Sequence, residues 1–163
     1  RFAQNEGLYI STVNAVRALP DSVSRHVVDD MKALLTVTSN QAAQLANHFV
    51  SADGTGRIAI ICPNDLIKPV REAVRHRLSS LMAPSEYQRL IDQPEWDEQI
   101  SVCGTEMVKG LEFDAVIVIE PGRIEDDAPS RLVAASDLYV ATTRPTQKLV
   151  IVRTKEDERS LNI

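Results

Sequence analysis

Two short segments carry side chains that could bind a nucleoside triphosphate. The first, Val108–Val118, contains Lys109, Gly110 and Glu112 in a turn that leads into a run of β-branched residues. Its glycine lets the backbone approach a ligand closely, and its carboxylate can accept hydrogen bonds from ribose hydroxyls. The second, Tyr139–Arg144, brings one arginine near the end of an apolar helix. A guanidinium in such a position can stabilise charge on a transferring phosphoryl group.

The loop that would cradle the phosphates is absent from the sequence, which contains no G-x-x-x-x-G-K-[ST]. The two segments therefore outline half of a nucleotide site, and we expect one lobe of a two-lobed ATP-driven machine that is catalytically silent alone. Each segment taken singly also suits a plainer interpretation. The first would be a solvated turn before a strand, and the second an exposed arginine near a helix carboxyl end, where cations are favoured.

Composition and charge restrict the class of protein. The chain has 163 residues, of which 44% are hydrophobic, and this favours one globular domain spanning 1–163. Its net charge of −5 excludes nucleic-acid binding driven by overall charge, so such a contact must be local or must depend on a basic neighbour outside this chain. No segment approaches the ~20 apolar residues of a membrane span, and no charged-then-apolar leader opens the chain. We expect a cytoplasmic protein without a membrane partner, and the first residue, Arg1, fits a segment of a longer protein.

The elements that must position the two segments alternate between strands and helices. We expect strands at 32–38, 57–62, 100–104, 115–119 and 149–153, and helices at 39–50, 66–81, 84–91 and 130–143. Residues 1–30 show no dominant period, and 121–129 resembles an acidic loop. Alternation of this kind predicts an α/β fold with a parallel sheet, whose ligands bind at the carboxyl ends of its strands. We therefore expect the 109–112 turn and the end of the 130–143 helix to reach that edge.

The two segments resemble motifs of a known family. Val108–Val118 and Leu138–Val150 are similar to motifs V and VI of the UvrD-like superfamily 1 helicases, K-G-L-E-[FW]-x-x-V and Y-V-A-x-T-R-A. The likeness covers about residues 57–153, since 57–64 resembles the first strand of the second RecA-like domain in these enzymes. It implies a three-layer RecA-like (P-loop NTPase-like) domain with a mostly parallel sheet and helices on both faces.

The resemblance also implies roles for particular residues. Gly110 and Glu112, with Lys109 beside them, would contact ATP, and Arg144 would be the arginine finger that reaches the γ-phosphate. The N-terminal RecA-like lobe of the same polypeptide would supply the P-loop and the ligands of Mg²⁺. We therefore expect neither a metal site nor firm ATP binding in this chain alone. Nucleic acid, with DNA as the expected form, would be bound by the intact protein.

Two departures from the family pattern bear on its partners. Where these helicases carry a Thr-x-His pair that contacts single strands, this chain has Gly104 and Glu106. A carboxylate there would repel phosphate, which argues against a nucleic-acid contact through Thr105 and Glu106. The connector at 82–99 is short where larger relatives insert an accessory domain, and this resembles the HelD-like branch, whose members act on RNA polymerase.

Three alternative functions remain open at this point. The chain could be a lobe of a HelD-like factor that recycles RNA polymerase, or a non-catalytic docking module that kept the fold. The third, a small-molecule α/β enzyme, is disfavoured because G-x-G-x-x-G and G-x-S-x-G are both absent.

Four further groups of residues have structural interpretations. Cys62 and Cys103 are expected to be reduced and structural, and the three histidines share no metal-ligand spacing: His26, His48 and His76. The acidic run 125–127 is expected to be a solvated loop rather than a metal site. One helix has a basic side, which we expect to be solvated, with phosphate contact as the alternative: Lys68, Arg71, Arg75 and Arg77.

Overall fold

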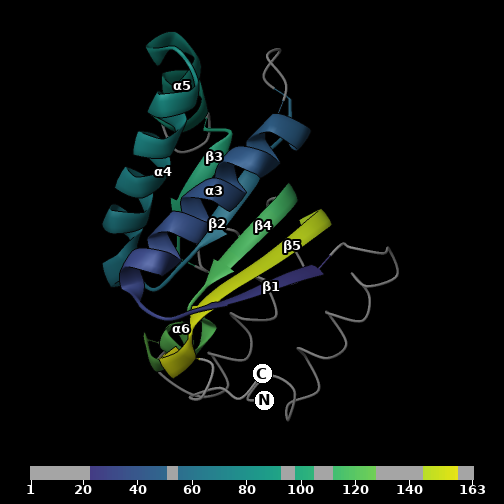
Figure 1. Cartoon of the computed structure of the whole chain (residues 1–163). Coiled ribbons are helices and arrows are strands. Elements are labelled where there is room, and N and C mark those ends of the chain that lie inside the picture. Colours follow the sequence, from purple (N-terminus) through teal and green to yellow (C-terminus); the bar gives the residue numbers. More distant parts are fainter. Residues whose placement is uncertain (1–22, 51–54, 93–97, 105–111, 128–144, 158–163) are drawn as a thin grey trace.

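The structure is a computed structural model and describes residues 23–50, 55–92, 98–104, 112–127 and 145–157. A five-stranded sheet, parallel throughout, runs through this part of the chain in the order β1-β5-β4-β2-β3 (Figure 1). The strands are β1 (Val23–Val28), β2 (Ile58–Ile61), β3 (Ile100–Cys103), β4 (Phe113–Ile119) and β5 (Pro145–Thr154). The helices are α3 (Met31–Phe49), α4 (Ile67–Leu81), α5 (Pro84–Ile91) and α6 (Pro121–Asp127), with a 3₁₀ turn η1 (Asn64–Leu66) before α4.

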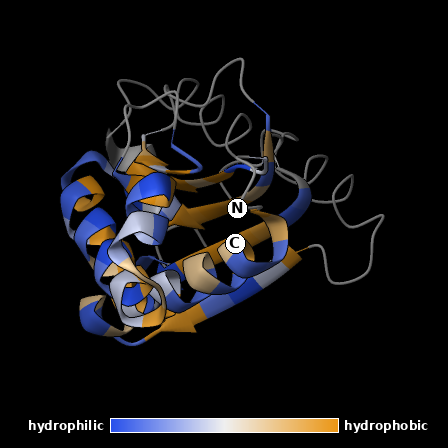
Figure 2. Cartoon of the chain, turned by 90° about the horizontal axis from the view of Figure 1, so that it is seen from above, coloured by the Kyte–Doolittle hydropathy of each residue, from blue (hydrophilic) through white to orange (hydrophobic). Residues whose placement is uncertain are grey.

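The central strands are buried on both faces of the sheet. Side chains alternate between the faces along a strand, and Ile60, Ile117 and Val150 pack into the core shared with α3 and α4. Their neighbours on the opposite face, Val116 and Ile151, are also buried. Figure 2 shows the hydrophobic colouring concentrated on the strands. Such near-continuous apolar runs are typical of a parallel sheet covered on both sides, and this agrees with the predicted three-layer α/β class.

Helix α3 is longer than predicted, and the strand expected at 32–38 is wrong. The helix begins after Asp30, whose carboxylate accepts a 2.8 Å hydrogen bond from the Ala33 backbone N–H. The β-branched run around Val37 resembles a strand, but the buried positions recur at helical spacing: Leu34, Thr38, Ala42 and Leu45. Burial of this stripe against the sheet therefore outweighs the local strand preference.

Three other elements also differ from expectation. Residues 121–127 form α6 instead of a loop, and β1 lies within the segment that showed no period. Strand β5 begins at Pro145, four residues earlier than predicted. By contrast β2, β3, β4, α4 and α5 confirm the expected strands and helices within a few residues. The helix expected at 130–143 lies outside the described residues.

Gly56 is required where the chain leaves α3 and approaches β2. Its φ is +92°, and a Cβ there would lie 2.0 Å from the carbonyl oxygen of Phe49. Gly56→Ala is therefore expected to lower the free energy of unfolding by about 2–3 kcal/mol, from backbone strain and overpacking. Urea unfolding measures this, with the exposed Ser85→Ala as a control that should change stability by less than about 0.5 kcal/mol. Equal stability of the two variants would contradict the close approach.

Candidate functional site

The two motif-bearing segments lead into neighbouring strands. β4 and β5 lie side by side (Figure 1), and Phe113 pairs with Pro145 in their register. Glu112, which is exposed, directly precedes Phe113, and in the sequence Arg144 directly precedes Pro145. Because the strands are parallel, both begin at the same edge of the sheet. The positions at which the chain enters β4 and β5 therefore adjoin one another at the amino edge.

Asp114 forms hydrogen bonds with residues at the start of two neighbouring strands on this edge. One carboxylate oxygen accepts a 2.9 Å hydrogen bond from the Arg57 backbone N–H, and the other lies 3.5 Å from the Gln147 side-chain nitrogen, which donates to it. The Asp114 N–H donates in turn to the Arg57 carbonyl at 2.9 Å. The amino ends of β2, β4 and β5 are thereby linked through the Asp114 side chain.

The pairing of β4 with β5 is irregular next to this link. Phe113 pairs with Pro145, but Ala115 pairs with Lys148, so β5 uses one extra residue over the same span. Such a bulge redirects the chain locally and is often found beside functional sites. The bulge therefore fixes the position of the first residues of β5 next to the start of β4, which Glu112 precedes.

We predicted that the nucleotide-binding residues lie at the carboxyl edge of the sheet. For those that the structure describes, this position is wrong. Glu112 and Pro145 lie at the amino edge, because each comes directly before its strand rather than after it. Lys109, Gly110, Arg144 and the Thr105–Glu106 region lie outside the described residues, so their predicted roles stay predictions.

The carboxyl edge holds a cluster that the sequence did not reveal. Glu120 follows β4 in a left-handed conformation, with φ of 51°. Its carboxylate accepts hydrogen bonds from the backbone N–H and, at 3.0 Å, the hydroxyl of Thr154 at the end of β5. Burial raises the pKa of Glu120. These contacts lock the end of β4 to the end of β5 across the strand pair.

Asp157 fixes the start of α6 in the same cluster. Its carboxylate accepts a 3.0 Å hydrogen bond from the Arg123 backbone N–H and forms a 2.8 Å ion pair with Arg153. Both charged side chains are at least 95% buried. A Cβ on Gly122 would lie 2.6 Å from the Asp157 carboxylate, so a larger residue there would require that carboxylate to shift. The i, i+4 spacing of Arg153 and Asp157 is the one sequence signal for the pair.

The basic side of α4 is only partly solvated. Arg71 forms an ion pair with Glu98, whose side chain is 5% exposed, and also donates to the Ile91 carbonyl. Arg75 forms a 2.9 Å ion pair with Asp92. These arginines therefore join α4 to both ends of the connector between α5 and β3. Lys68, Arg75 and Arg77 are exposed, as expected, whereas Arg71 is only partly exposed.

The two cysteines are free, as predicted. Burial raises the pKa of the Cys62 thiol to about 12, so it stays protonated and unreactive near neutral pH. Within the described ranges, no group of three His, Cys, Asp or Glu side chains could hold a metal ion. Nor does any helix there have the length and apolar character needed to cross a membrane.

The arrangement defines an α/β domain of the RecA-like class, with the exposed carboxylate of Glu112 at the amino edge of its parallel sheet. No family model and no curated protein matches the chain. A solved structure that does match is the C-terminal domain of a possible DNA helicase from Lactobacillus plantarum WCFS1. The TM-score is 0.58 and the identity 18%, over 89% of this chain and 83% of that one. At this identity the likeness establishes the shared fold.

Proposed function

We propose that the chain is the second RecA-like lobe of an ATP-dependent superfamily 1 helicase or translocase. The register of Phe113 with Pro145 is the observation that carries the proposal. It places Phe113, which follows Glu112 in the sequence, beside Pro145, which follows Arg144, and this supports a composite nucleotide site at that edge. The shared fold with the C-terminal domain of a possible DNA helicase supports the same conclusion.

The chemistry of this lobe would be recognition and charge stabilisation. The Gly110 amide and the Glu112 carboxylate would bind the nucleotide, the carboxylate through ribose hydroxyls. Arg144 would stabilise the charge that spreads over the γ-phosphoryl group in the transition state. ATP hydrolysis would then drive opening and closing of the cleft between two lobes. Nucleic acid, with DNA as the proposed form, would be moved by that motion.

Mg²⁺ does not fit the described residues, because they offer no group of three acidic or histidine ligands. Glu112 is a single exposed carboxylate, and Asp114 is engaged with Arg57 and Gln147. We therefore assign the metal ligands and the P-loop to an N-terminal lobe. This chain would not coordinate the metal.

The compact connection between α4 and β3 favours a small motor lobe. Only α5 and a short connector separate them, and Arg71 and Arg75 hold both ends of that connector against α4. This agrees with the HelD-like branch suggested by the motifs, and we propose that finer assignment on the sequence resemblance.

The isolated chain is expected to hydrolyse ATP at less than about 1% of the rate of the full-length parent, because its sequence contains no P-loop to hold the phosphates. A coupled phosphate-release assay measures the hydrolysis rate of both proteins. A protein without ATPase activity, at equal concentration, gives the background rate. Hydrolysis by the isolated chain that disappears in its own Arg144→Ala variant would contradict the half-site.

A further inference from the structure

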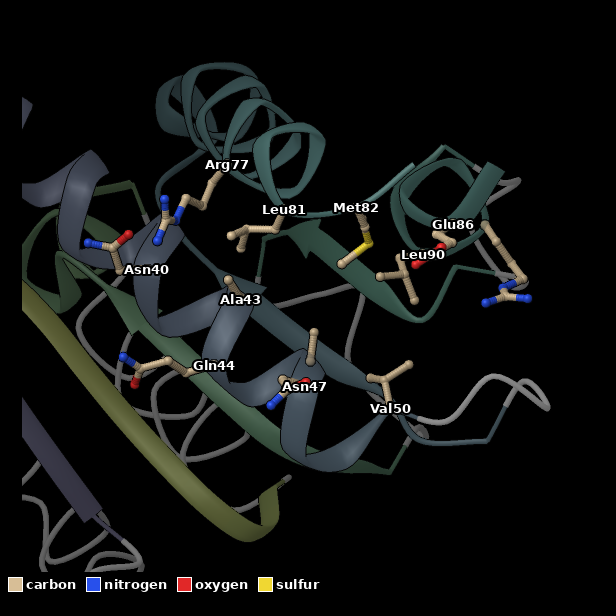
Figure 3. A pocket seen from close by; sticks show the side chains of 12 residues that line it. Asn40, Ala43, Gln44, Asn47, Val50, Arg77, Leu81, Met82, Glu86 and Leu90 are labelled. Carbon is tan, nitrogen blue, oxygen red and sulfur yellow. The ribbon is translucent and has the colours of Figure 1, made fainter. Parts of the chain in front are cut away.

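A groove of about 730 Å³ lies where α3, α4 and α5 meet, apart from both edges discussed above (Figure 3). Its floor includes Leu81, Met82 and Leu90, which face Ala43 of α3 and Val50, the residue that follows α3. Leu81 is 53% exposed and is one of two large hydrophobic side chains exposed in the described part of the chain. An apolar side chain left open in a hollow of this kind is typical of a binding surface.

The α3 wall of the groove carries unused hydrogen-bonding groups. Asn40, Gln44 and Asn47 follow one another at i, i+4 and i+7, so they form a stripe along the helix. None of these amides has a hydrogen-bond partner among the residues that the structure describes. Each can donate and accept, and the stripe extends over about 10 Å at 1.5 Å per residue.

Charge is distributed unevenly along the groove. Arg77 lies toward the same end as Asn40, whereas Glu86 lies toward the other end with Leu90 (Figure 3). Arg89 is one helical turn from Glu86 in α5 and offsets its charge. Arg77 forms no ion pair within the described ranges and is exposed. The Arg77 end is therefore positive, on a chain whose net charge is −5.

We propose that this groove binds an extended peptide segment of a partner protein. The segment carries an acidic residue that pairs with Arg77 and a large apolar residue that packs on Leu81 and Met82. An extended backbone has free N–H and C=O groups that side-chain amides can satisfy, whereas a helix satisfies its own. The surface is independent of the nucleotide site proposed above.

Two other occupants fit the groove less well. Single-stranded nucleic acid is held by aromatic side chains on which bases stack, and none of the residues that line this groove is aromatic. In a symmetric dimer the groove would face the same groove of a second copy, so Arg77 would approach Arg77 rather than an acidic residue.

The proposal is tested by selecting displayed random peptides of about 12 residues, long enough to cross the groove, on the 163-residue chain. The enriched peptides are then labelled and titrated by fluorescence anisotropy. They are expected to share an acidic residue and a large apolar residue at a fixed spacing. Leu81→Asp should weaken their binding at least tenfold, and Arg77→Glu about fivefold.

A charge swap separates recognition from damage to the fold. Replacing the acidic residue of the peptide with lysine should restore binding to Arg77→Glu. Lys68→Glu makes the same change of charge on the same helix, at an exposed residue outside the groove, and should leave binding unchanged. Circular dichroism confirms that each variant is folded.

Three results would overturn the proposal. One is that peptides are enriched equally on the chain and on Leu81→Asp. Another is that a labelled oligothymidine binds and Leu81→Asp abolishes that binding, which would assign the groove to nucleic acid. The third is that sedimentation detects a dimer that Leu81→Asp disrupts, which would make the surface a self-association site.

Discussion

Arg144→Ala in the full-length parent protein should lower ATP turnover by about 10³-fold, the scale on which an arginine finger acts. The expected loss is in kcat, with little change in KM, because the guanidinium stabilises charge that develops only in the transition state. Steady-state hydrolysis assays across a range of ATP concentrations measure both quantities. The prediction depends on β4 and β5 being neighbours, since Phe113, which follows Glu112, pairs with Pro145, which follows Arg144 in the sequence.

Two further variants make this result specific. Arg144→Lys keeps the charge but loses the planar fork of donors, so most of the defect should persist. Arg25→Ala removes an exposed arginine of β1 and should leave turnover unchanged. Near-normal turnover in Arg144→Ala would remove the finger from the proposed mechanism, while the fold and the peptide groove would stand.

Arg153→Met should lower the free energy of unfolding by about 3–5 kcal/mol near neutral pH. The substitution fills much of the volume of the side chain but leaves the Asp157 carboxylate buried without its cation. Asp157 also receives the Arg123 N–H, so the start of α6 should loosen together with the end of β5. Urea unfolding followed by circular dichroism measures the loss.

The pH dependence of that loss has a defined sign. Burial raises the pKa of Asp157, and the Arg153 charge is the principal influence that opposes the rise. Without Arg153 the folded state takes up a proton at a higher pH than the unfolded chain does. Between the ordinary pKa of aspartate and the raised folded value, the folded state binds more protons, so stability increases as pH falls. The deficit of Arg153→Met should therefore be smaller at about pH 5 than at about pH 7.

Lys155→Met provides the matched comparison. Lys155 forms a 2.6 Å ion pair with Asp29, but both side chains are more than 60% exposed. Solvent screens such a pair, and we expect no measurable loss of stability at either pH. If Arg153→Met were as stable as Lys155→Met, the buried ion pair would not hold α6 and β5 together.

Elements with strong local signals were predicted correctly. Strand β2 reads Ile-Ala-Ile-Ile and is buried at every position. Helix α4 repeats its apolar residues at helical spacing, and Val70, Val74 and Leu78 are buried as that spacing requires. In each case the apolar pattern within one element is enough to predict it. The side chains that form the pattern are the ones buried in the sheet or the core.

Elements that depend on distant partners were missed. The first half of α3 was predicted as a strand because its β-branched residues favour one, but burial of its apolar side against the sheet favours the helix. α6 was predicted as a loop because the residue that fixes its N-terminal N–H groups, Asp157, lies 34 positions from Arg123. Contacts of that kind leave almost no trace in local periodicity.

The sequence alone predicted the α/β class of the fold, which the structure confirms, because apolar periodicity is a local property of the chain. Motif spacing is local in the same way, and it led to the proposal that two segments bind a nucleotide. Only the tertiary structure decided which edge of the sheet Glu112 occupies, through the direction and order of β4 and β5. It also brought Arg77 and Leu81 of α4 together with α3 and α5 to form the groove. Both outcomes follow from how parallel strands and the helices that cover them pack, which joins residues far apart along the chain.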